Sequence, residues 1–337
     1  PGQPLTAEAR PFMHALSSLP CLPEAAGTPL GAEVYRGLTT MPKRLSPWLF
    51  YDQRGSELFE AITELPEYYL TRTEHAIFSE RADEIMEAAG TAKLAILELG
   101  AGTAAKTEVL LGAAVRRQES LTYVPIDISE TALEEARLRI GETLPNVLVK
   151  PTVADYTRDL PAIPAGGCRR LVLYIGSSIG NFDPPEAMAL LRKLRRRLAP
   201  GDLLLMGVDH VKDRTTLLRA YNDQAGVTAE FNRNVLVRIA RELGARFRPG
   251  LFRHRAVWNE RESRVEMHLE SLVTQEVAIP ALDLTVSFRR GESIHTENSY
   301  KFTGDSATSL LARSGFAVRR DWTDERRWFG VYLAEAS

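Results

Sequence analysis

The chain has 337 residues, of which 44% are hydrophobic and 26% charged, a composition typical of one large or two moderate globular domains. A net charge of −2 does not supply the basic field that nucleic-acid binding needs, and no apolar run reaches the length of a membrane span. Two cysteines make no disulfide framework and the six histidines show no metal-ligand spacing, so we expect a cytoplasmic monomer without a metal.

The first part of the chain predicts an arm followed by two helices. Residues 1–45 are rich in Pro, Ala and Gly and are typical of a wrapping arm, in which AEARPFMHAL predicts a short helix. Apolar residues at helical spacing predict a helix over 56–70 that ends at Pro66. Residues 71–90 predict a second helix with Gly90 as its C-cap.

Short apolar strands then alternate with helices. Strands are expected within 94–100, 121–129, 146–156, 169–182 and 203–211, with helices over 104–117, 129–141 and 184–202. Strands that are apolar throughout, rather than in alternation, are typical of a parallel sheet with helices on both faces.

After residue 211 the pattern changes. Residues 215–244 read as one helix, and 254–279 predict a β-hairpin with a charged turn near 259–263. We interpret this part as a lobe inserted into the sheet domain. Residues 307–336 predict a helix followed by two strands, a hairpin that closes the sheet.

The stretch ELGAGTAAKT (98–107) lies between the first strand of the sheet and the next helix. Its small residues let the backbone approach a ligand. It is not a dinucleotide fingerprint, because Ala105 stands where the third glycine belongs, and it lacks the G-K-[ST] ending that a P-loop needs. We expect Glu98 to repel a pyrophosphate, which argues against an NAD-dependent dehydrogenase and favours a cationic ligand.

Acidic residues follow the next two strands. Asp127 suits ribose hydroxyls, and Asp155 suits the amino group of an adenine held against Tyr156. Together with the glycine turn, these strand ends predict a positively charged adenosine ligand without a phosphate tail, which describes S-adenosylmethionine (SAM). A plain α/β turn with surface acids is the alternative.

Longer stretches resemble one known family, the SAM-dependent L-histidine Nα-methyltransferases of ergothioneine biosynthesis, from about residue 33 to 336. The stretches are FYDQRGSELFEAITELPEYYLTRTE (50–74), LELGAGTAAKT (97–107), GSSIGNF (176–182), DHVKD (209–213), LLRAYNDQAGVTAEFNRNVL (217–236), VEMHL (265–269) and TENSYKF (296–302). The resemblance implies an α/β fold, a Rossmann-like class I SAM methyltransferase domain with an inserted α+β substrate-binding lobe. The implied bounds are 73–211 plus 302–337 for the SAM-binding domain, and 1–72 plus 212–301 for the substrate-binding domain.

The resemblance also implies the roles of single residues. Those implied to bind SAM are Tyr51, Gly100, Lys106, Asp127, Asp155, Tyr156 and Gly176. Those implied to bind the substrate are Tyr68, Asn181, Tyr221, Met267, Glu297 and Ser299, and Tyr51, Tyr68 and Asn181 are implied to be catalytic. Asn181 and Tyr221 would hold the substrate carboxylate, and Glu297 and Ser299, with Tyr68, its imidazole.

The segment IHTENSYKF (294–302) carries the most substrate-specific expectation. If it is a strand, Glu297 and Ser299 lie on one face, with Tyr300 and Phe302 on the other. A carboxylate and a hydroxyl side by side match a neutral imidazole, which has one hydrogen-bond donor and one acceptor.

The implied reaction is Nα-trimethylation of L-histidine to hercynine, with SAM as cofactor and a small amino acid as the partner. A free α-amino group has a pKa of roughly 7.7–8, so its deprotonation costs only about 1 kcal/mol and no strong base is required. Methylation of another amino acid or small amine, such as tryptophan, is an alternative. A non-catalytic SAM-binding module is an alternative from another class.

Overall fold

The computed structural model describes residues 24–161 and 167–337. Cys21 and the short helix expected in AEARPFMHAL lie outside the described residues. Within the described ranges, no helix combines the length and the apolar character needed to cross a membrane.

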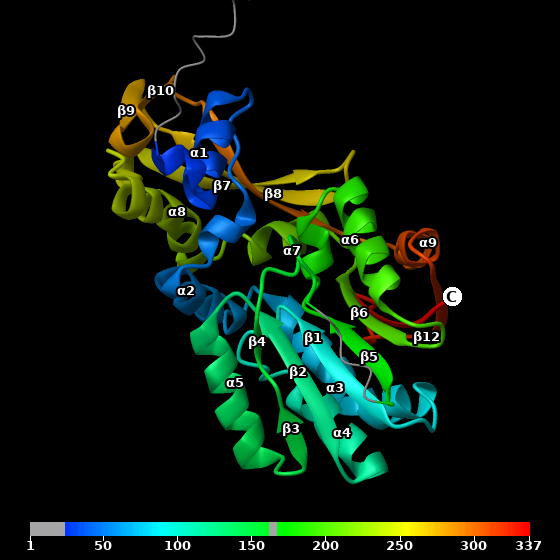
Figure 1. Ribbon diagram of the computed structural model, residues 1–337. Helices are drawn as coiled ribbons and strands as arrows, with labels where there is room; N and C mark the ends of the chain where they lie inside the picture. Colours follow the sequence, from blue (N-terminus) through cyan, green and yellow to red (C-terminus); the bar gives the residue numbers. More distant parts are fainter. Residues whose placement is uncertain (1–23, 162–166) are drawn as a thin grey trace, which may run out of the picture.

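A large sheet forms one half of the molecule (Figure 1). Its strands are β1 (Leu94–Leu99), β2 (Leu121–Asp127), β3 (Val147–Val149), β4 (Thr152–Val153), β5 (Arg169–Tyr174), β6 (Leu203–Asp209), β12 (Phe316–Thr323) and β13 (Phe329–Ala336). The order is β12-β13-β6-β5-β1-β2-β3, with β4 also paired to β2. All pairs from β3 to β6 are parallel, and β13 runs antiparallel to both β6 and β12. The predicted parallel sheet and its closing hairpin are confirmed.

Helices cover both faces of this sheet because its strands are apolar on both sides. One face packs against α3 (Tyr69–Ala88), α4 (Glu108–Gln118) and α5 (Glu130–Thr143). The other packs against α6 (Pro184–Arg197) and α9 (Gly304–Arg313). Gly90 follows α3 with a φ of 97°, a left-handed conformation that suits its expected role as a helix cap.

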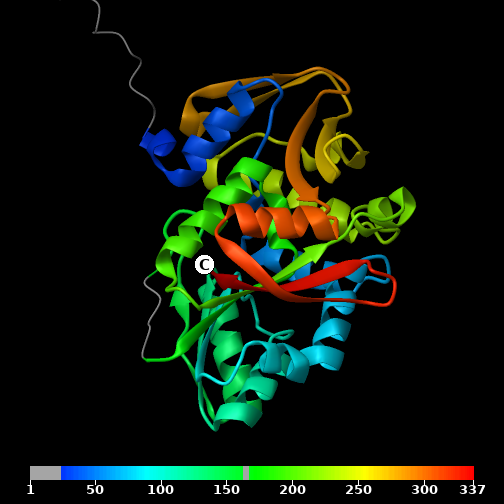
Figure 2. The ribbon, with the colours of Figure 1, turned by 90° about the vertical axis from the view of Figure 1, so that its right-hand side faces the viewer.

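The rest of the chain forms a second group of elements at the opposite end from α4 and α5 (Figures 1 and 2). It contains α1 (Pro29–Thr39), α2 (Gln53–Thr63), α7 (Arg214–Ala220), α8 (Val227–Leu243), β7 (Phe252–Asn259), β8 (Arg264–Ser271), β9 (Gln275–Ile279), β10 (Leu284–Phe288) and β11 (Ser293–Tyr300). Short 3₁₀ turns also belong to it, at Glu24–Gly27, Pro47–Phe50, Pro249–Leu251 and Pro280–Leu282. Strands β11-β8-β7 form an antiparallel sheet, and β9 pairs with β10. One apolar core joins residues 26–70 to residues 217–294.

The single helix expected over 215–244 is wrong, because the structure has two helices there. Helix α7 ends at Ala220 and α8 begins at Val227. Between them, the Asp223 carboxylate accepts hydrogen bonds from the backbone N–H groups of Val227 (2.9 Å) and Thr228 (2.8 Å). Such a local cap competes with a continuous helix, and apolar spacing does not reveal it. The break leaves Tyr221 at the end of α7.

Strand β11 carries a β-bulge. His295 pairs with His268 on β8, whereas Glu297 pairs with the adjacent Met267, so Thr296 is the extra residue. Neighbouring residues of β8 point to opposite faces, and therefore His295 and Glu297 do too. Glu297 shares a face with Ser299, as expected, but regular alternation would also have placed His295 there.

The 3₁₀ turn η3 (Ser178–Asn181) joins the large sheet to β11, and Gly180 makes this approach possible. A Cβ added at Gly180 would lie 2.7 Å from the carbonyl oxygen of Tyr300. We therefore expect Gly180→Ala to lower the free energy of unfolding by about 1–3 kcal/mol. Urea denaturation measures this change. Gly250→Ala is the control, since nothing lies within 4 Å of its added Cβ. Equal stability of the two variants would contradict the close approach.

Candidate functional site

Tyr51 marks the place where the two groups of predicted residues meet. Burial raises the pKa of its hydroxyl well above the usual value, and the charge of Glu297 on β11 raises it further. Tyr68, Tyr156 and Asp127, at the end of β2, act on it in the same direction. Because such effects fall off with distance, Tyr51 lies near members of both the predicted SAM residues and the predicted substrate residues.

The glycine turn after β1 is held by Asp127. Gly100 and Gly102 have φ angles of 70° and 52°, which favour glycine. The Asp127 carboxylate accepts hydrogen bonds from the backbone N–H of Gly102 (2.9 Å) and of Ser129 (3.0 Å). It is half-buried, and each oxygen keeps lone-pair capacity for a ligand.

Glu98 does not face this turn as a ligand-repelling charge. It is buried, and its carboxylate accepts hydrogen bonds from the hydroxyls of Thr107 (2.7 Å) and Tyr123. Burial raises the pKa of Glu98 to about 7, although these bonds act to lower it. The expectation that Glu98 repels a pyrophosphate is therefore wrong, because its side chain ties the loop to β2.

Asp155 and Tyr156 lie next to the glycine turn. A Cβ at Gly100 would lie 3.4 Å from the Tyr156 hydroxyl oxygen. The Tyr156 ring packs edge-on against Tyr174, with 5.9 Å between centroids. The Asp155 carboxylate accepts a hydrogen bond from the backbone N–H of Thr157 (3.0 Å). The structure thus brings the glycine turn, Tyr156 and both acids together, as the sequence predicted.

Lys106 and Gly176 meet at a residue that sequence reasoning missed. Glu74 on α3 is fully buried; its carboxylate accepts from the Lys106 ammonium (2.7 Å) and from the backbone N–H of Gly176 (2.7 Å). Glu74 lies within a helix, and the only sign of its role in the sequence was that it occupies a position on the buried face of that helix. Through it, two of the expected cofactor residues are fixed to α3.

Glu297 is the most unusual group on the substrate side. It is half-buried, and its carboxylate makes no hydrogen bond or ion pair with any residue of 24–161 or 167–337. Burial raises the pKa of Glu297 to about 7, against the opposing charge of Lys301. Met267 lies opposite it on β8, and Tyr68 packs against Tyr221 with 6.4 Å between ring centroids.

A buried network fixes the hydroxyls of Tyr221 and Ser299. The Lys301 ammonium donates to Tyr221 Oη (2.8 Å) and Ser299 Oγ (2.7 Å), and it pairs with Asp209 (2.8 Å). The two hydroxyls lie 2.6 Å apart and share a further hydrogen bond. Since all three ammonium protons are used, the hydroxyls keep one proton to donate to a ligand. If both hydroxyls donate, their mutual contact must open when the ligand binds.

Asp209, at the end of β6, is the centre of this network. Its carboxylate also accepts from the Tyr69 hydroxyl (2.7 Å) and from the Lys212 ammonium. Burial acts to raise the pKa of Asp209, but the charges of Lys301 and Lys212 hold it below the usual value. Sequence reasoning missed Asp209 and Lys301, although both follow strands as Asp127 does.

Asn181 lies in η3, between the large sheet and β11. It is half-buried, and its amide makes no hydrogen bond to another side chain or backbone group of the described chain. An amide offers two donors and an acceptor, so Asn181 retains its full capacity for a ligand.

Comparison with known proteins assigns the chain to one family. A family model described as histidine-specific, SAM-dependent methyltransferase matches residues 30–336. The chain is 44% identical over 311 residues to histidine N-alpha-methyltransferase of Mycolicibacterium smegmatis, covering 92% of this chain and 96% of that protein. The identity and both coverages are the same for the histidine N-alpha-methyltransferase of Mycobacterium tuberculosis. This chain is also 30% identical to ergothioneine biosynthesis protein 1 of Neurospora crassa, and the match covers 88% of this chain and 33% of that protein.

Removing the Lys301 charge tests the buried network. Lys301→Met leaves Asp209 and the two hydroxyls without their common donor, and breaking such a buried pair costs about 3 kcal/mol. Urea denaturation should show this loss. Arg81→Met, which removes a surface ion pair with Glu84, is the matched control and should change stability little. Similar stabilities for the two variants would mean that the Lys301 network does not support the fold.

Proposed function

The chain belongs to the histidine-specific, SAM-dependent methyltransferases, and within this family we propose that it methylates the α-amino nitrogen of L-histidine. Three transfers give hercynine, and the reaction is a step of ergothioneine biosynthesis. The observation that carries the proposal is the half-buried Glu297 carboxylate, which has no partner in the described structure and lies on the same face of β11 as Ser299.

We propose that the chain divides into a SAM-binding domain, residues 73–211 plus 302–337, and a substrate-binding domain, residues 1–72 plus 212–301, of which residues 1–23 and 162–166 lie outside the described residues. The separate apolar cores support this division, since residues 26–70 share a core with 217–294, not with the large sheet. The two domains meet at β11 and at the ends of β5 and β6.

The turn from Gly100, with Asp127, Asp155 and Tyr156, is suited to an adenosine. The missing Cβ of Gly100 leaves room beside Tyr156, and Asp127 keeps lone pairs for ribose hydroxyls. Lys106 and Gly176 would hold the amino-acid end of the cofactor, and Tyr51 would contact its methyl-bearing end. When bound, SAM supplies an activated methyl group on a sulfonium.

Glu297 and Ser299 would select the imidazole of the substrate, assisted by Tyr68. The Glu297 carboxylate accepts a hydrogen bond from the ring N–H, and the Ser299 hydroxyl donates to the other ring nitrogen. Met267 would pack on the ring. The Asn181 amide and the Tyr221 hydroxyl would hold the substrate carboxylate, which places the α-amino group toward Tyr51.

The tyrosines position the amine and do not deprotonate it. Burial raises the pKa of Tyr51 and of Tyr68 well above the usual value, so both remain neutral hydroxyls. Their oxygens accept hydrogen bonds from the amine and orient its lone pair. Their ring faces attract the substrate ammonium group, which becomes larger with each methyl transfer. Removing the first amine proton costs only about 1 kcal/mol near neutral pH.

The setting proposed for this reaction is a monomer in the cytoplasm that acts on a free amino acid. A net charge of −2 and a half-buried free Cys168 support this setting over one that involves nucleic acid or disulfide bonds.

Mass spectrometry of L-histidine incubated with the protein and SAM tests the function. We expect one, two and then three added methyl groups on the α-amino nitrogen. Tryptophan in a parallel reaction tests the alternative, because an indole has no second ring nitrogen to accept from Ser299. Faster methylation of tryptophan than of histidine would overturn the proposed substrate.

Substitution of Glu297 tests the imidazole site. Glu297→Gln loses a charge-assisted hydrogen bond of about 1.5–3 kcal/mol, so histidine affinity at pH 8 should fall by roughly 10- to 150-fold. Calorimetric titration measures this, and affinity for S-adenosylhomocysteine should stay unchanged. Ser293→Ala, at the other end of β11, is the control.

The same titration has a defined pH dependence. Because the pKa of Glu297 is raised to about 7, the carboxylate fraction grows from about one tenth at pH 6 to about nine tenths at pH 8. Histidine affinity should therefore rise with pH, and the rise should become shallower in Glu297→Gln, where only the ligand titrates. An equally steep pH dependence in Glu297→Gln and in the unaltered chain would indicate a structural role for Glu297. So would an equal loss of affinity for histidine and for S-adenosylhomocysteine.

A further inference from the structure

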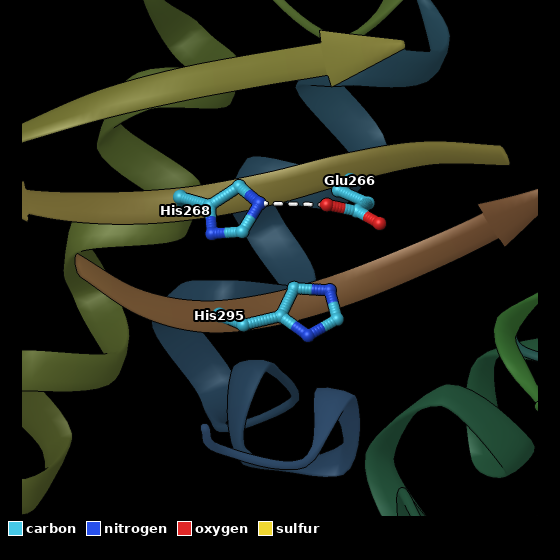
Figure 3. Close-up of side chains that lie close together, drawn as sticks. All are labelled: Glu266, His268 and His295. Atoms are coloured by element: carbon cyan, nitrogen blue, oxygen red, sulfur yellow. Dashed lines mark hydrogen bonds and ion pairs between the residues drawn. The ribbon is translucent and has the colours of Figure 1, made fainter. Parts of the chain in front are cut away.

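Glu266, His268 and His295 gather on the face of the three-stranded sheet that points away from the proposed substrate site (Figure 3). Glu266 and His268 lie two residues apart on β8 and so share a face, and His295 is the direct partner of His268 on β11. The bulge at Thr296 turns His295 to this face while Glu297 takes the other. All three side chains are half-buried.

The distances suit a metal ion. One potential ligand atom from each residue lies within 4.8 Å of the other two. His268 Nε2 is 3.1 Å from Glu266 Oε2, and the two imidazole rings lie 4.9 Å apart at an interplanar angle of 27°. Ligand atoms around a tetrahedral zinc ion, with bonds of about 2.0–2.1 Å, are roughly 3.3 Å apart. The observed spacing, up to 4.8 Å, is wider, so metal binding would draw the three side chains together.

Two arginines face the cluster, and both already have partners. Arg264 donates through Nε to Glu266 Oε1 (2.8 Å), which leaves Oε2 directed at His268. Arg255 on β7 pairs with Glu270 on β8 (3.3 Å). These pairs reduce the repulsion of a cation, but they leave a weaker site than one with free carboxylates would be.

From this arrangement we propose that Glu266, His268 and His295 bind a divalent transition-metal ion of the zinc class, with one coordination position left for water. Two imidazoles and a carboxylate are a ligand set that zinc favours. No motif in the sequence revealed it, because the ligands come from two strands that the fold pairs. The proposal differs from the expectation, based on histidine spacing, that the chain has no metal site.

The site is linked to the substrate strand. His295 Nε2 donates to the carbonyl oxygen of Glu297 (3.0 Å), and Figure 3 shows a ring nitrogen of His295 facing Glu266. A metal ion bound at Nε2 requires the neutral ring to carry its proton on Nδ1 instead, which releases the Glu297 carbonyl. Metal binding should therefore weaken histidine binding severalfold, a consequence that rests on the proposed function, whereas the metal site itself does not.

Calorimetric titration of the metal-free full chain with zinc chloride tests the site. We expect one equivalent to bind, with affinity at least about tenfold weaker in His268→Gln and His295→Gln. His75→Gln, an exposed histidine on α3, is the matched control and should bind as the unaltered chain does. Thermal melts of each variant establish that it is folded.

Cobalt substitution gives an independent readout. A three-ligand site with bound water should give the visible absorption of a four- or five-coordinate cobalt ion, and zinc should displace it. No binding by the folded chain, or equal affinity in all variants, would overturn the metal site. Zinc binding that leaves histidine affinity unchanged would keep the site but remove its link to Glu297.

Discussion

The buried ion pair between Asp209 and Lys301 joins the two halves of the molecule. Asp209 ends a central strand of the large sheet, and Lys301 directly follows β11 of the inserted lobe. Both side chains are fully buried, so neither charge is solvated by water. Such a pair is tolerated only where further hydrogen bonds satisfy the remaining donors and acceptors. Here Tyr69, Tyr221 and Ser299 do so, and two of these three belong to the expected site.

The charge balance around Asp209 also suits the ligand. Lys301 and Lys212 together carry one positive charge more than Asp209, and burial lowers the pKa of Lys212 to about 8. Glu297, with its pKa near 7, offsets only part of that surplus. A substrate that brings a carboxylate completes the balance, which favours an amino acid over a neutral amine. This argument depends on buried charges, for which sequence spacing holds no signal.

The predictable part of the structure is the part that local patterns control. Apolar strands separated by helices identified the parallel sheet, and its strand ends located Gly100, Asp127 and Asp155. The rest depends on tertiary contacts. The break after Tyr221 needs the Asp223 cap, and the role of Glu98 depends on Tyr123, which lies on the adjacent strand. The bulge in β11 follows from pairing with β8, and it alone decides that His295 and Glu297 face opposite sides.

The selectivity of the proposed site for an imidazole follows from which of its groups donate hydrogen bonds and which accept them. Lys301 is a pure donor, so the oxygens of Tyr221 and Ser299 must accept from it and turn their own protons to each other or to a ligand. Glu297, as a carboxylate, can only accept. An imidazole satisfies both requirements, because it donates from one nitrogen and accepts at the other. An indole satisfies Glu297 but offers Ser299 no acceptor, so Ser299 keeps its hydrogen bond with Tyr221 and gains none from the ring. In the proposed site, Lys301 would therefore contribute to substrate choice without touching the substrate, because it fixes the hydrogen bond that Ser299 can offer.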